Sequence, residues 1–123
     1  MIKGLGTDIV EVERMAKKVK KNSFLMEVFT IKEIEYCQLK KHPAQHYAAR
    51  FAAKEAYMKA IGKGWSKEAN FKEIEITKTK EGAPSILLSG NTLLSFTQLN
   101  YKHIFVSISH TTSMASSTVI ITA

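Results

Sequence analysis

AQHYAARFAAKEAYMKAI, residues 44–61, is the longest helical pattern in the chain. Alanine and long unbranched side chains favour an α-helix. The break at His42-Pro43 precedes the pattern, and the Gly62-Lys63-Gly64 that follows it is typical of a helix C-terminus. We therefore predict a long central helix over residues 44–61.

A helical wheel places two charged residues of this segment among apolar ones. At about 100° per residue, Glu55 and Lys59 fall on the same side as Phe51. Arg50 and Lys54 fall about 100° to 140° away, where we expect solvated side chains. Burying a carboxylate is costly unless it is paired or binds a cation. Glu55 and Lys59 therefore form either a surface i,i+4 pair or the edge of a functional site.

Shorter elements are predicted before this helix. An apolar, glycine-containing run indicates a strand at residues 2–7, and a charged pattern indicates a helix at residues 11–21. A second helix at residues 30–40 opens with Thr30-x-x-Glu33, which matches a capping box.

After the long helix the pattern changes to that of strands. Ile74 and Ile76 alternate with charged residues, which predicts a half-buried strand at residues 71–78. A turn at residues 80–84 leads to its hairpin partner at residues 85–88, followed by a helix at 91–99 and strands at 103–109 and 115–122. These elements predict an α+β fold with an antiparallel sheet.

Composition indicates one folded domain, residues 1–123, with a basic surface. The chain has 45% hydrophobic and 24% charged residues, which is typical of a soluble globular protein. Its 18 lysines and arginines exceed its 11 acidic residues, giving a net charge of +7. Such a charge attracts polyanions, phosphorylated ligands or an acidic protein. Part of it lies on the first predicted helix, at Arg14, Lys17, Lys18, Lys20 and Lys21.

Cysteine content and hydropathy suggest a cytoplasmic protein. The single cysteine, Cys37, has no intramolecular disulfide partner, and we expect a buried or unreactive thiol. We find no signal peptide at the start and no run of about 20 apolar residues, so we expect no membrane insertion.

Three polar positions have two possible interpretations each. Asp8 either caps the following helix together with Glu11, or meets Glu55 around a Mg²⁺ ion, which prefers carboxylate oxygens. His110 either has a structural role or joins Thr111 in binding a phosphate. Gly62-Lys63-Gly64 is either a simple helix stop or a loop that covers an anionic ligand.

Three ordered motifs together resemble a known family. Gly4-x-Gly6-Thr7-Asp8-Ile9-Val10, Arg50-Phe51-Ala52-Ala53-Lys54-Glu55-Ala56-x-x-Lys59-Ala60 and Val106-Ser107-Ile108-Ser109-His110-Thr111 are similar to the motifs of the holo-acyl-carrier-protein synthases. These are small bacterial members of the 4′-phosphopantetheinyl transferase superfamily, and the similarity covers essentially the whole chain. One departure is Trp65-Ser66, which replaces an apolar residue and often another glycine after Gly64.

The resemblance implies roles for residues of all three motifs. Asp8 and Glu55 match the Mg²⁺ ligands, and Lys59 matches the catalytic lysine. The family's coenzyme A contacts near the phosphates and the adenosine match Arg50, Lys54, His110 and Thr111, and its mobile loop over the coenzyme matches Gly62, Lys63 and Gly64. The resemblance also implies a homotrimer with active sites between subunits.

The implied reaction moves 4′-phosphopantetheine from coenzyme A to a serine of apo acyl carrier protein, a step that supplies fatty acid biosynthesis. It also implies that the basic first helix receives the acidic carrier. Two other classes remain as alternatives: a basic nucleic-acid-binding module and a coenzyme-binding protein without activity. The chain lacks the stacked aromatic pattern and the zinc-finger spacing of common nucleic-acid binders, so we expect no nucleic acid partner.

Overall fold

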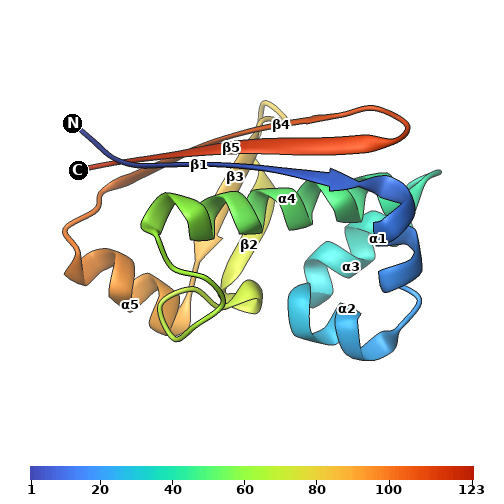
Figure 1. Cartoon of the computed structure of the whole chain (residues 1–123), viewed down its shortest axis with the longest axis horizontal. Coiled ribbons are helices and arrows are strands. Elements are labelled where there is room, and N and C mark those ends of the chain that lie inside the picture. The colour runs from blue at the N-terminus through green and yellow to red at the C-terminus, as the bar shows by residue number, and fades with distance from the viewer.

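A three-stranded antiparallel sheet and a long helix on one of its faces form the frame of the molecule (Figure 1). The computed structural model describes all residues, 1–123. The strands are β1 (Ile2–Glu11), β4 (His103–His110) and β5 (Met114–Thr122), in the order β1-β5-β4. Ile2 pairs with Thr122, so the two termini lie side by side.

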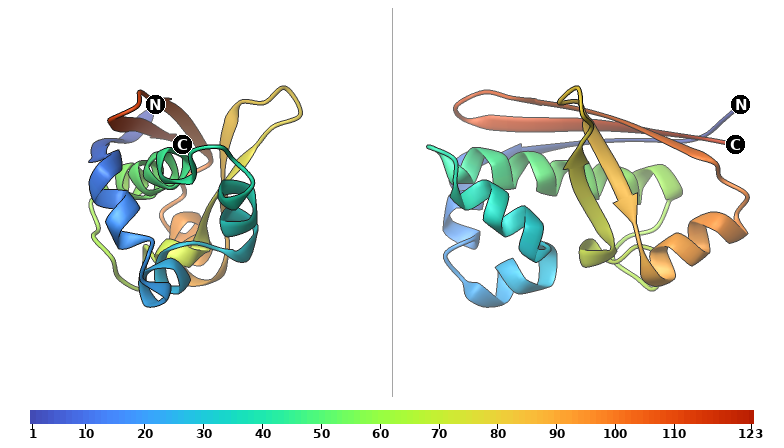
Figure 2. Two further views of the ribbon diagram at one scale, coloured as in Figure 1. Left: turned by 90° about the vertical axis from the view of Figure 1, so that its right-hand side faces the viewer. Right: turned by 180° about the vertical axis from the view of Figure 1, so that it is seen from behind.

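A second sheet is separate from the first. It is a hairpin of β2 (Ile74–Lys78) and β3 (Pro84–Leu88), whose turn projects from the body (Figure 2). The α+β class and the antiparallel pairing are confirmed, but the strands form two sheets and not one. The period-two prediction is confirmed at Ile74 and Ile76, which are both buried. Residues Phe71–Glu73, predicted as strand, form a 3-10 turn, η1.

Five helices complete the fold: α1 (Val12–Lys18), α2 (Asn22–Val28), α3 (Ile31–Gln38), α4 (Pro43–Ile61) and α5 (Gly90–Gln98). α4 confirms the predicted long helix, with Pro43 in its first turn and Gly62 in the left-handed conformation at its end. The capping box at the start of α3 is also confirmed: the Thr30 hydroxyl accepts from the Glu33 amide, and the Glu33 carboxylate accepts from the Thr30 amide.

The prediction for residues 2–21 was wrong in two respects. β1 continues to Glu11, so Asp8 lies within a strand, opposite Ser117 of β5. The first helix ends at Lys18, and the chain then forms α2, which was not predicted. The reason is tertiary, because β1 pairs with β5 along its whole length, and these ladder bonds outweigh the local helical pattern.

Two glycines let β1 lie directly on α4. A Cβ atom at Gly4 would collide with the backbone carbonyl of Ala60, and one at Gly6 would collide with the backbone of Ala56. The strand therefore contacts the helix backbone to backbone, which only glycine permits at these positions. This close approach brings Asp8, two residues further along β1, beside the turn of α4 that carries Glu55.

α4 is covered on two sides (Figure 1). It packs on β1 and β5 of the large sheet, and its opposite side meets α3 and β2. Cys37 lies in this core, where burial raises the pKa of its thiol to about 12, in agreement with the predicted unreactive thiol. No helix in the structure has both the length and the apolar character that a bilayer crossing requires.

Candidate active site

Asp8 and Glu55 line the same cavity, whose volume is about 280 Å³. β1, α1 and α4 form its walls, and Arg14, Lys18 and Phe51 also contribute to the lining. Because Asp8 belongs to a strand, the alternative in which it caps α1 is wrong. The residue at the cap position of α1 is Glu11, and its side chain makes no capping hydrogen bond.

Lys59 reaches across to β1. Its ammonium donates to the Asp8 carboxylate at 3.0 Å and to the Thr7 carbonyl at 3.1 Å. The Lys59 side chain is 55% exposed and that of Asp8 only 15%. The salt bridge of Lys59 is thus with Asp8 of β1, and not with Glu55 one turn away on its own helix.

The cavity places negative charge in a partly dry environment. Burial raises the pKa of Glu55, the nearby Asp8 carboxylate raises it further, and Lys59 and Lys18 act in the opposite direction. Two such carboxylates favour a cation between them. No group of three or more His, Cys, Asp and Glu side chains lies together anywhere in the chain. A pair of carboxylates is the set that suits Mg²⁺, which keeps waters or substrate phosphates as its other ligands.

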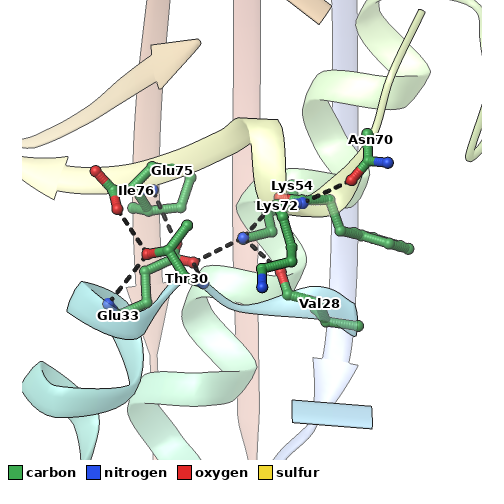
Figure 3. Close-up of polar contacts among 9 residues, drawn as sticks. Val28, Thr30, Glu33, Lys54, Asn70, Lys72, Glu75 and Ile76 are labelled. Atoms are coloured by element: carbon green, nitrogen blue, oxygen red, sulfur yellow. Dashed lines mark hydrogen bonds and ion pairs between the residues drawn. The ribbon is translucent and has the colours of Figure 1, made fainter. Parts of the chain in front are cut away.

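Lys54, predicted to be solvated, is completely buried. Its ammonium donates three hydrogen bonds, to the Val28 carbonyl at 2.6 Å, the Glu33 carboxylate at 2.7 Å and the Phe71 carbonyl at 2.8 Å (Figure 3). Glu33 also accepts from the Ile76 amide at 2.9 Å. All three ammonium hydrogens are therefore used within the protein, and the predicted contact of Lys54 with coenzyme A is wrong.

The wheel misplaced Lys54 because it assumed a helix with one buried stripe. α4 is buried on two sides, and the side away from the large sheet faces α2, α3, η1 and β2. Burial lowers the pKa of Lys54, and the charge of Glu33 opposes that shift. The ion pair with Glu33 offsets the free-energy cost of burying the Lys54 ammonium.

Arg50 is also buried, with 6% exposure, and not solvated as predicted. Its guanidinium carbon lies 4.0 Å from the centre of the Tyr36 ring, and its Nε atom is buried without a hydrogen-bond partner. It lines a hollow of about 180 Å³ together with Tyr36, Lys78 and His110. A buried donor without a partner beside further cations is suited to an anionic group.

Three polar residues that line this hollow, which we call the Arg50 hollow, were not identified in the sequence analysis: Tyr36, His46 and Lys78. His46 packs edge-on against His110, with ring centroids 5.6 Å apart, and burial, followed by the His110 charge, lowers the pKa of His46. Burial would raise the pKa of Tyr36, but the neighbouring Lys78 and the charge of Arg50 lower it overall. The sequence could have indicated His46, because it lies four residues before Arg50 and therefore on the same side of the helix. It could not have indicated Lys78, which belongs to a strand far along the chain.

The remaining predicted site residues lie in exposed turns or on α1. Thr111, in the turn between β4 and β5, accepts from the Met114 amide at 3.1 Å. Lys63 and Gly64 lie in the exposed segment after α4. The basic residues of α1 and of the turn after it are all exposed, and we call them the basic face: Arg14, Lys17, Lys18, Lys20 and Lys21. Since Arg14 and Lys18 line the carboxylate cavity, the basic face borders it directly.

Comparison with known proteins gives one consistent family. The family model of the 4′-phosphopantetheinyl transferase superfamily matches residues 4–118. A curated holo-(acyl-carrier-protein) synthase of Geotalea daltonii is 44% identical over 117 residues, covering 94% of this chain and 94% of that protein.

Solved structures agree with this comparison. A holo-(acyl-carrier-protein) synthase from Neisseria meningitidis superposes with a TM-score of 0.93 at 27% identity, and all of both chains is covered. The synthase from Helicobacter pylori, solved in complex with coenzyme A, superposes with a TM-score of 0.83 at 34% identity, covering 96% of this chain and 99% of that one.

Proposed function

The chain belongs to the 4′-phosphopantetheinyl transferase superfamily and is an enzyme of that class, and from this we propose that it transfers 4′-phosphopantetheine from coenzyme A to a serine of an apo acyl carrier protein. Adenosine 3′,5′-bisphosphate is the other product, and the carrier of fatty acid biosynthesis is the acceptor. The observation that carries the proposal is the shared cavity of Asp8 and Glu55, with Lys59 beside it.

Asp8 and Glu55 would hold a Mg²⁺ ion. When bound, this ion supplies positive charge that binds the diphosphate oxygens and makes the phosphorus more electrophilic. The serine oxygen attacks the phosphorus, the bond to the bisphosphate breaks, and the serine proton leaves to a base. Lys59 neutralises charge on the departing bisphosphate, and Glu55, a carboxylate in the cavity that makes no salt bridge, takes the proton.

The Arg50 hollow suits the adenosine end of coenzyme A. Arg50, Lys78 and His110 line it, and they match the anionic phosphates of that end. It shares no lining residue with the carboxylate cavity. Arg50 lies about 140° from Glu55 around α4, so the two hollows lie on different sides of this helix. We therefore propose that a coenzyme A molecule binds the carboxylates of one subunit and the Arg50 hollow of a neighbour.

The outer face of the large sheet is the surface through which subunits would meet. Leu5 of β1 and Phe105 of β4 both pair with Ile120 of β5, forming one apolar row across three strands. Leu5 is 64% exposed and Phe105 58% exposed. An exposed apolar row on the sheet face away from α4 favours association with copies of the chain, and a homotrimer is the assembly that we propose.

Assemblies of two different variant chains test whether each active site is formed by two neighbouring subunits. Glu55→Gln and His110→Ala chains are each expected to lose transfer activity in separate solutions. When the two are refolded together, random assembly leaves one in four sites with both intact residues, so we expect about a quarter of wild-type activity to return. Transfer is measured on the mixture, and mass spectrometry of differently tagged chains verifies mixing. Mixed assemblies without recovered activity would place the whole site in one chain.

The basic face is the proposed docking site for the acidic carrier, because it borders the cavity where transfer occurs. Lys17→Glu with Lys21→Glu is expected to raise the KM for the carrier about tenfold at low salt, with kcat changed less than about twofold, since neither residue lines the cavity. Steady-state kinetics at several salt concentrations measure this. The matched double reversal Lys80→Glu with Lys102→Glu, exposed elsewhere, should leave the KM unchanged. An equal rise of the KM in both variants would show that the basic face is not the docking site.

The direct test of the proposed function weighs the carrier. The protein is incubated with coenzyme A, Mg²⁺ and an apo carrier, and intact-mass spectrometry looks for the addition of one phosphopantetheine. The same mixture with a chelator in place of Mg²⁺ is the control. A carrier whose mass stays unchanged with active coenzyme A and a folded carrier would refute the transfer.

A further inference from the structure

We propose that Lys59 is a built-in competitor of the divalent ion at Asp8. In this inference the Lys59 ammonium neutralises Asp8 before the metal binds, and the metal displaces it. The idea deepens the proposed function, because it rests on the assignment of Asp8 and Glu55 as metal ligands. It adds a property that this assignment does not contain: removing Lys59 should strengthen metal binding.

The first observation is where the ammonium lies. Of the two proposed metal ligands, Lys59 pairs with Asp8, and the distance between its Nζ atom and Asp8 Oδ1 is 3.0 Å. The Asp8 side chain is 15% exposed, and Lys59 is its salt-bridge partner. A divalent ion bound by Asp8 and Glu55 would have to share this carboxylate with the ammonium.

The second observation concerns the charge that Asp8 and Glu55 share. The two carboxylates line the same cavity, so their negative charges lie near each other, and the Lys59 ammonium neutralises part of that charge at Asp8. An ammonium and a dication within a few ångströms repel each other, and the repulsion is twice that between two unit charges. The site therefore favours one of the two cations at a time.

The third observation is that Lys59 is free to leave. Its side chain is 55% exposed, and its only other hydrogen bond is to the Thr7 carbonyl at 3.1 Å. A lysine of this kind loses little when it turns into solvent, because exposed ion pairs contribute little free energy. Lys54, five residues earlier on α4, is the contrast: it is fully buried, and its three hydrogen bonds hold it in place.

The exchange has a consequence for the reaction. A displaced Lys59 stays one turn of α4 from Glu55, beside the place where the diphosphate would bind. Metal binding would thus release the ammonium from Asp8 at the moment when a phosphate becomes its best partner. The opposite possibility is that Lys59 orients Asp8 for the metal. In that case the metal should bind more weakly when Lys59 is removed.

Mn²⁺ binding without coenzyme A or carrier distinguishes the two possibilities. Free and bound Mn²⁺ are measured by electron paramagnetic resonance for the wild type and for Lys59→Met, Lys63→Met and Glu55→Gln. We expect Lys59→Met to bind Mn²⁺ about tenfold more tightly. Lys63→Met removes the same charge from the nearby exposed loop and should change the affinity less than about twofold. Glu55→Gln should bind much more weakly.

A second readout follows Lys59 itself. Mg²⁺ should increase the rate at which an amine-reactive acetylating reagent modifies Lys59, measured by peptide mass spectrometry, because the ammonium loses its carboxylate partner. Modification of Lys63 should not respond. Equal or weaker Mn²⁺ binding by Lys59→Met, with normal binding by the wild type, would overturn the inference and leave the proposed function intact. Wild-type protein that binds no Mn²⁺ would instead contradict the metal site.

Discussion

Glu55→Gln is expected to lower phosphopantetheine transfer by at least about 100- to 1,000-fold while leaving the fold unchanged. Glutamine has nearly the shape of glutamate, but it has no charge, so of the two proposed ligands only Asp8 keeps a carboxylate for a divalent ion. Glu55 makes no hydrogen bond or salt bridge that a folded chain would lose. The measurement is the initial rate of carrier modification at saturating Mg²⁺, with circular dichroism to compare the folds.

The control for Glu55→Gln is the same substitution at Glu35. Glu35 lies on α3 and is exposed, and it lines none of the cavities described above. Glu35→Gln should therefore retain the wild-type rate. A Glu55→Gln chain that modifies the carrier as fast as the wild type would show that Glu55 is not a metal ligand or a base, and the proposed chemistry would lose its centre.

Lys54→Met is expected to lower the free energy of unfolding by about 3–5 kcal/mol. The substitution keeps much of the side-chain volume, but it leaves the Glu33 carboxylate buried with one charge partner fewer (Figure 3). It also removes the only side-chain donor to the Val28 and Phe71 carbonyls. These groups join α2, α3 and η1 to α4, so the loss affects the contact between two layers. Urea denaturation followed by circular dichroism measures the change.

Lys59→Met is the matched control, because it removes the same functional group from an exposed position on the same helix. We expect it to change the free energy of unfolding by less than about 1 kcal/mol. Should Lys54→Met fail to fold, Glu33→Gln provides a milder test, since the amide oxygen can still accept from Lys54. Equal stability of Lys54→Met and Lys59→Met would show that the buried ion pair has no special importance for the fold.

Local signals explain which elements were predicted correctly. The signals that start and end α4 lie at its own two ends, Pro43 at the first position and Gly62 directly after the last. The capping box of α3 needs only Thr30 and Glu33. Such signals act within a few residues and survive in any tertiary context. The β1 boundary was wrong because the strand is held by β5, over 100 residues away, and the printed sequence gives no register for that pairing.

The candidate site was likewise predicted correctly in part. Its residues were identified from motifs, and the structure places Asp8 and Glu55 in one cavity, with Lys59 paired to Asp8 beside it. The resemblance matched Lys54 to a coenzyme A contact, and the helical wheel agreed with an accessible side chain because it treats every charged residue outside one stripe as solvated. That rule does not apply to a helix packed on two sides, where a charge can be buried if another element supplies its partner.

From the sequence by itself came the α+β class and the long helix, because these depend on periodicity and on neighbours along the chain. The candidate residues of the site came from motifs that resemble those of a known family. Only the tertiary structure decided that Lys59 pairs with Asp8, that Lys54 belongs to the core, and that the Arg50 hollow lies on the other side of α4 from Glu55. The physical reason is that burial and charge pairing depend on distances in space, and Gly4 and Gly6 set those distances by allowing β1 to contact the backbone of α4.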